Sequence, residues 1–137
     1  MKLLVVMTHY PFPPRTGSAV VAYNSIKHLS KSHSLKFVCL RPEKECFHPA
    51  EFVDHVEFVC YRKVSRLVMW LRYLSYMLAG VPPSVSAYTS RAMRRKVKTL
   101  IESGRTDAIL LFEMSAIQYC PPSYYGKLIV NIEDPGS

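Results

Sequence analysis

Glycine is scarce in this sequence, with five residues among 137, and its scarcity excludes the common phosphate-binding motifs. The turn after the first predicted strand contains only Gly17, whereas the dinucleotide fingerprint needs three closely spaced glycines and a P-loop ends in Gly-Lys-Ser/Thr. A nicotinamide-binding domain is further disfavoured because the second predicted strand ends in Leu40 and Arg41, where such domains carry an acidic residue.

Long apolar runs are also missing. No run reaches the roughly 18–20 residues that a membrane-spanning helix needs. The N-terminal segment MKLLVVMTHY is followed by no small-residue cleavage site, so it predicts a first strand rather than a signal peptide. The expected location is the cytoplasm, with peripheral attachment to the inner face of the membrane as a further option.

Motifs for metal binding or nucleophilic catalysis are absent. The four cysteines form no C-x-x-C pair, and buried reduced thiols are favoured over a zinc site built on Cys46 and His48. The five histidines occur in no H-E-x-x-H motif, and the sequence has no G-x-S-x-G and no D-x-D. We therefore expect neither a metal ion nor a cofactor.

Acidic residues are few, and the resulting positive charge is concentrated in one part of the chain. The formal net charge is +8, and residues 62–105 alone carry ten Arg or Lys with a single acid, Glu102. Charge gathered in this way suggests an anionic partner, although a solvated basic face is the simpler alternative.

Apolar segments alternate with helical patterns along the rest of the chain. Short apolar runs predict strands at 2–7, 35–40, 56–60, 107–112 and 127–132, and amphipathic patterns predict helices at 18–32, 66–79 and 90–103, with Ser18 capping the first. A further short helix is expected within 113–122. This order predicts a single domain over residues 1–137, with an α/β Rossmann-like three-layer fold and a mainly parallel sheet flanked by helices.

The first forty residues carry a specific resemblance. A strand, the loop PFPPRTGS, the helix VVAYNSIKHLS and a second strand resemble the start of retaining glycosyltransferases of the two-domain GT-B architecture, of the bacterial polysaccharide type. The resemblance implies a donor-diphosphate role for Gly17 and its neighbours Arg15, Thr16 and Ser18. The loop itself also suggests an anion-binding site, because it leads to a helix N-terminus, which attracts anions. A simple turn is an equal alternative.

The resemblance extends more loosely to the segments ILLFEMSAIQY and KLIVNIEDP near the end of the sequence. It implies that Glu113 and Asp134 face the acceptor. His9 follows the first predicted strand, where a histidine could meet an acceptor hydroxyl or simply cap the loop. The resemblance also implies that the nucleotide-sugar is held by a second, C-terminal domain that this sequence does not include, so that the chain alone would be inactive.

The predicted helix at 66–79 and the basic helix after it allow two interpretations. Arginines and aromatic residues are typical of helices that lie on anionic lipid, and a lipid-linked acceptor would fit the resemblance. In the other interpretation, Leu67, Met69, Leu71, Leu74 and Leu78 pack against the sheet. Nucleic acid is disfavoured as a partner because the basic helix lacks stacking aromatic residues. The residues considered for the anion-binding surface are Arg66, Trp70, Arg72, Arg91, Arg94 and Arg95.

Two functions follow. The favoured one is the acceptor-side domain of a glycosyltransferase that moves a sugar from a nucleotide-sugar to a hydroxyl, in polysaccharide or glycolipid synthesis. The alternative is a non-catalytic α/β module that binds an anionic membrane surface or a partner protein through its basic helices.

Overall fold

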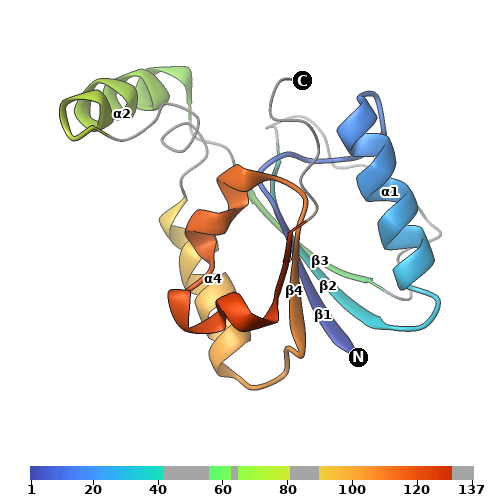
Figure 1. Ribbon diagram of the computed structural model, residues 1–137. Helices are drawn as coiled ribbons and strands as arrows, with labels where there is room; N and C mark the ends of the chain where they lie inside the picture. Colours follow the sequence, from blue (N-terminus) through green and yellow to red (C-terminus); the bar gives the residue numbers. More distant parts are fainter. Residues whose placement is uncertain (42–55, 63–64, 81–89, 131–137) are drawn as a thin grey trace.

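The computed structural model describes residues 1–41, 56–62, 65–80 and 90–130. Five parallel strands form one sheet in the order β3-β2-β1-β4-β5. Helices cover both of its faces, with α1 on one side and α4 on the other (Figure 1). The predicted α/β Rossmann-like three-layer domain is confirmed. The strands are β1 (Lys2–Met7), β2 (Ser34–Arg41), β3 (Val56–Arg62), β4 (Ala108–Leu111) and β5 (Leu128–Val130).

The central strand β1 is buried on both faces, as its continuous apolar run predicts. Leu3, Val5 and Met7 face the cluster that packs under α1, whereas Leu4 and Val6 face the cluster under α4. The neighbouring strands alternate in the same way, because successive side chains of a strand point to opposite faces. Two separate apolar cores therefore hold the sheet between its helical layers.

Helix α1 (Gly17–Leu29) has its N-cap two residues earlier than the sequence predicted. Thr16, not Ser18, is the N-cap, and its hydroxyl accepts a hydrogen bond from the amide of Ala19 at 3.3 Å. Both residue types cap helices well, and the extended backbone of Thr16 decides between them. The predicted apolar stripe is confirmed, with Ala22 and Ile26 fully buried against the sheet.

Helix α4 (Arg91–Glu102) covers the opposite face and matches its predicted pattern. Its apolar stripe is buried, and Ser90 caps its N-terminus by accepting a hydrogen bond from the amide of Met93. Most of the basic side chains lie on the other side of the helix and are exposed, whereas Lys96 is partly buried. The buried residues of the stripe are Met93, Val97, Leu100 and Ile101.

Helix α2 (Arg66–Leu78) corrects the interpretation in which its leucines pack against the sheet. None of its residues is buried, and Leu67 and Leu78 are 72% and 92% exposed. The helix stands apart from the sheet, beyond the end of the molecule where the strands terminate (Figure 1). An apolar segment predicts burial only when another element covers it, and no described element covers this one.

The chain between β4 and β5 forms two short 3₁₀ helices. The first, η2 (Met114–Tyr119), confirms the predicted short helix, whereas η3 (Pro122–Lys127) was not predicted and delays the start of the last strand to Leu128. Buried Tyr119 fixes this layer to α4, because its hydroxyl accepts a hydrogen bond from the amide of Ser90 at 3.1 Å. Within the described residues, no helix has the length and apolar character needed to cross a bilayer.

Candidate functional site

The candidate site begins where β1 ends. Thr8 and His9 follow the strand directly, with Thr8 buried and the His9 side chain 54% exposed. The loop beyond them is anchored by Phe12, which is 1% exposed and packs its ring against Tyr23 and Phe37 at centroid distances of 6.0 and 6.2 Å. The Phe12–Pro13 peptide bond is cis. This anchored loop holds Thr8 and His9 at the carboxyl end of the sheet.

Glu113 meets both residues from the end of the neighbouring strand β4. One carboxylate oxygen, Oε2, accepts hydrogen bonds from the Thr8 amide at 2.9 Å and from the Thr8 hydroxyl. The other oxygen, Oε1, lies 2.5 Å from Nδ1 of His9. Ser115 adds a fourth member, because its hydroxyl oxygen lies 2.7 Å from that of Thr8. Residues about one hundred positions apart thus form one polar network.

The network keeps Glu113 ionised. Burial by itself would raise the pKa of this carboxyl group, but the hydrogen bonds from His9 and Thr8 and the charge of His9 together hold the pKa below its usual value. The side chain is only 17% exposed, so these partners act with little screening by water. A negative charge is therefore fixed beside the imidazole of His9.

An ionised carboxylate only accepts hydrogen bonds, and this sets the direction of every bond in the network. Nδ1 of His9 must donate to Oε1, and the Thr8 hydroxyl must donate to Oε2. Because the Thr8 hydroxyl has a single proton, the Ser115 hydroxyl donates to the Thr8 oxygen. The order of donation runs from Ser115 through Thr8 to Glu113 on one side, and from His9 to Glu113 on the other.

A histidine held in this way is suited to accept a proton. When Nδ1 carries the hydrogen, the lone pair of the neutral ring is on Nε2, and the carboxylate stabilises the imidazolium that forms on protonation. More than half of the His9 side-chain surface is exposed, so the residue is accessible from outside the protein. The arrangement is that of a general base with an orienting carboxylate, which serves to activate a hydroxyl or a water molecule.

The network also lies at the point where the connections of the sheet change direction. From β1 the chain crosses through α1 to β2 on one side, whereas β4 pairs with β1 on the other side. The connecting helices leave for opposite faces of the sheet (Figure 1). Open parallel sheets bind ligands at this switch point, beyond the carboxyl ends of the strands.

The structure brings two of the predicted site residues together and does not describe a third. His9 and Glu113, each assigned separately to the acceptor side, are in direct contact. Asp134 lies outside the described residues. Sequence reasoning missed Thr8 and Ser115; the only available signal was that both flank the predicted residues at strand ends.

The predicted donor loop, Arg15 to Ser18, is exposed at the start of α1, at the same end of the molecule as the strand termini (Figure 1). A Cβ atom added at Gly17 would meet no atom within 4 Å, and this glycine has no positive φ. Neither packing nor backbone conformation thus requires glycine here, and the donor role of the loop stays a prediction.

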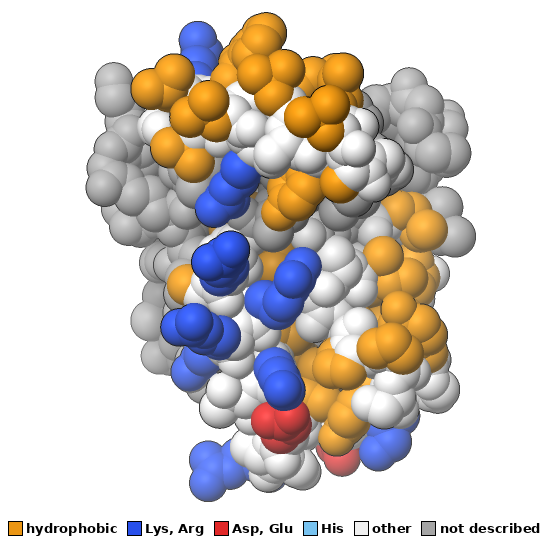
Figure 2. All heavy atoms as spheres, turned by 90° about the vertical axis from the view of Figure 1, so that its left-hand side faces the viewer, with side chains coloured by type: hydrophobic (Ala, Val, Ile, Leu, Met, Phe, Trp, Pro, Cys, Tyr) orange, Lys and Arg blue, Asp and Glu red, His pale blue; other side chains and the backbone are white. Residues whose placement is uncertain are grey.

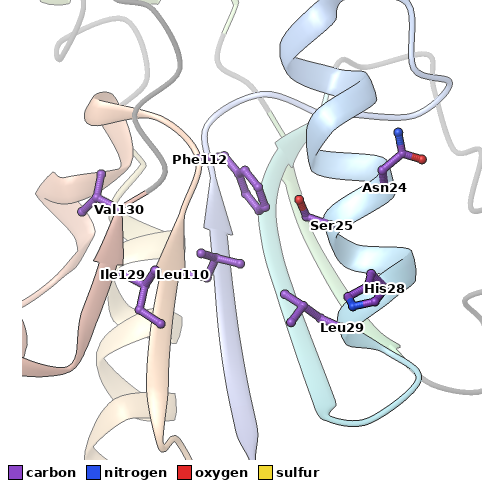
Figure 3. A pocket seen from close by; sticks show the side chains of 8 residues that line it. All are labelled: Asn24, Ser25, His28, Leu29, Leu110, Phe112, Ile129 and Val130. Atoms are coloured by element: carbon purple, nitrogen blue, oxygen red, sulfur yellow. The ribbon is translucent and has the colours of Figure 1, made fainter.

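A shallow apolar hollow of about 560 Å³ lies on the face of the sheet beside α1. Figure 3 shows its two walls, with α1 on one side and the strands β4 and β5 on the other. Phe112, which precedes Glu113, contributes to the wall next to the polar network. The lining residues are Asn24, Ser25, His28, Leu29, Leu110, Phe112, Ile129 and Val130.

The residues considered for an anion-binding surface lie on α2 and α4, away from the hollow. Within the described part of the chain, no three His, Cys, Asp or Glu side chains gather in a way that could hold a metal ion. Cys39 and Cys120 are buried, and neither forms a disulfide. Comparison with protein-family models, with curated proteins and with solved structures found no match to this chain.

Proposed function

We propose that this chain is the acceptor-side domain of a nucleotide-sugar-dependent glycosyltransferase and that His9 is its general base. The single observation that carries the proposal is the contact between His9 and ionised Glu113 at the switch point of the sheet. The resemblance of residues 1–40 to GT-B transferases supplies the substrate class by analogy.

The reaction follows from the chemistry of the pair. Nε2 of His9 takes the proton of an acceptor hydroxyl while the hydroxyl oxygen forms a bond to the anomeric carbon of the sugar. The bond from that carbon to the nucleotide diphosphate breaks, and its electron pair leaves with the diphosphate. Glu113 stabilises the imidazolium, and Thr8 and Ser115 hold Glu113 in place.

This mechanism has a stereochemical consequence. A single displacement on the face opposite the leaving group inverts the anomeric configuration, whereas the resemblance to polysaccharide-type enzymes implies retention. A base poised to activate the acceptor favours inversion, so the configuration of the product tests the assignment of His9. In this proposal a second domain holds the nucleotide, and the loop from Arg15 to Ser18 contacts the donor diphosphate.

The test uses the protein as it is produced in its source cells, with each variant introduced in the gene. Membrane fractions receive radiolabelled UDP-glucose, UDP-N-acetylglucosamine or GDP-mannose, and transfer to endogenous acceptors is measured. His9→Ala should reduce transfer by about 10²–10⁴-fold, the range typical of a lost general base. Glu113→Gln should reduce kcat more than it changes KM, because it acts through the orientation of His9.

His33→Ala is the matched control. This histidine lies beyond α1, where its ring nitrogen is 3.4 Å from the N-terminal amine, and it should be replaceable without loss of transfer. Equal transfer by wild type and His9→Ala would overturn the role of His9. Absence of transfer from all three donors in the wild type would overturn the choice of substrate class, and retention of configuration would overturn the direct displacement.

A further inference from the structure

Helix α2 presents its apolar side to the outside. Its three least exposed side chains, Met69, Arg72 and Tyr76, follow one another at three- and four-residue spacings and share one side of the helix. The opposite side carries a contiguous set of exposed large apolar residues. Those residues are Leu67 at 72%, Trp70 at 64%, Leu71 at 60%, Leu74 at 47%, Met77 at 55% and Leu78 at 92%.

An outward apolar stripe is unusual, because an amphipathic helix ordinarily turns that side to the core. Here leucines repeat at spacings of four, three and four residues on the exposed side. Scattered apolar side chains on a surface need no explanation, but a contiguous patch marks a site of interaction. The helix has 13 residues, about 20 Å, which is too short to span a bilayer and sufficient to lie along one.

Basic residues continue this surface on the same face of the molecule. Figure 2 shows apolar side chains gathered over α2 and Lys and Arg side chains gathered below them over α4. Within residues 65–80 and 90–105, Glu102 is the single acid, and it pairs with Lys98 at 3.7 Å. The exposed cations of α4 are Arg91, Arg94, Arg95 and Lys98.

We propose that this combined surface, the outward stripe of α2 with the basic side of α4, docks on an anionic lipid bilayer. Leu, Met and Trp side chains enter the boundary between headgroups and acyl chains, while the arginines contact anionic headgroups. Nucleic acid would match the cations but would leave the leucines in water. A second copy related by two-fold symmetry would cover the leucines but bring like charges together. Of these three partners, the bilayer is the one that matches both parts of the surface.

The only tryptophan in the sequence makes the test specific. Trp70 lies on the outward stripe, so its fluorescence reports on α2 alone. The whole chain is mixed with vesicles of phosphatidylcholine containing 30% phosphatidylglycerol, or of phosphatidylcholine only. We expect co-sedimentation and a blue-shifted Trp70 emission, quenched by brominated acyl chains, with the anionic vesicles only. Binding should weaken steeply as salt is raised.

Two variants separate the apolar and charged contributions, each with a matched control. Leu71→Ser with Leu74→Ser should abolish the blue shift, whereas Val20→Ser with Val21→Ser, which removes two exposed valines of α1, should not. Replacing the three arginines of α4 by Gln should weaken binding on the order of a hundredfold, since each cation near the membrane surface contributes about fivefold.

The control for the arginine variant is the replacement of Lys2, Lys31 and Lys127 by Gln. These lysines are exposed on other elements, and the same loss of charge there should change binding much less. Circular dichroism checks that every variant is folded.

Four results would overturn the proposal. The first is equal binding to zwitterionic and anionic vesicles, and the second is anionic binding without a change in Trp70 emission. The third is a concentration-dependent blue shift without lipid, together with a dimer in analytical ultracentrifugation, which would assign the surface to a second copy. Binding of a random-sequence RNA in preference to anionic vesicles would likewise assign it to nucleic acid. None of these results bears on His9, so the proposed reaction stands or falls separately.

Discussion

Replacing Glu113 by Gln keeps the shape of the side chain and removes its charge. The carboxylate accepts two hydrogen bonds from Thr8 and one from His9. The amide of Gln has one oxygen to accept them, and its NH₂ group would face a donor. Hydrogen bonds to a charged group contribute about 1.5–3 kcal/mol, so we expect Glu113→Gln to lower the free energy of unfolding by about that amount at pH 7.

The loss should depend on pH in a defined direction. Folding lowers the pKa of Glu113 from its ordinary value of 4.5, so folding favours the ionised form. The stabilisation from this group is therefore complete above about pH 4.5 and is lost as the pH falls through the lower pKa of the folded state. The difference in stability between wild type and Glu113→Gln should shrink over that same acidic range.

Urea unfolding followed by circular dichroism at a series of pH values measures this difference. Glu102→Gln is the control, because it makes the same change at an exposed i,i+4 pair and should cost less than about 0.5 kcal/mol. A cost at position 113 no larger than that of the control would refute the reasoning. So would a cost that stays constant from pH 7 to pH 3.

Two further predictions concern burial. Burial raises the pKa of the Cys120 thiol to about 11, so this thiol should resist iodoacetamide at pH 8 in the folded protein and react once urea unfolds the chain. Peptide mass spectrometry measures the two reaction rates, and equal rates in the folded and unfolded states would contradict the prediction. Leu71→Ala on the exposed side of α2 should change the free energy of unfolding by less than about 0.5 kcal/mol. In the same urea assay, Leu4→Ala in the core should lower it by about 2–5 kcal/mol. Comparable losses for the two variants would mean that another part of the chain covers α2.

The fold was predictable because strands buried on both faces leave a clear mark in sequence. The apolar run of β1 and the stripe of α4 each satisfy a single structural requirement, and both predictions are confirmed. Helix α2 is the element for which such a pattern did not predict the packing. Its Leu, Met and aromatic residues indicate an apolar surface that needs a partner, but they do not indicate which partner covers it.

The candidate site was predictable only in part. His9 was placed at the carboxyl end of the first strand, where parallel sheets carry ligand sites, and Glu113 was assigned to the acceptor side by the family resemblance. That they touch depends on β4 lying beside β1, and the order of strands in a sheet is not written in their order along the chain. The hydroxyls of Thr8 and Ser115 were missed because Thr and Ser are common in loops. Only the contacts of Thr8 with Glu113 and of Ser115 with Thr8 show that they belong to the site.

The separation of the network along the chain also bears on folding. The hydrogen bonds of Glu113 to Thr8 and His9 span 105 and 104 residues, so closing this loop carries a large entropic cost that local contacts cannot offset early. The imidazole of His9 acquires its orienting carboxylate only after β4 has joined β1. The Nδ1 proton of His9, observed by nuclear magnetic resonance, would then mark the pairing of β4 with β1. A nascent chain still lacking β4 would have its histidine but no oriented base.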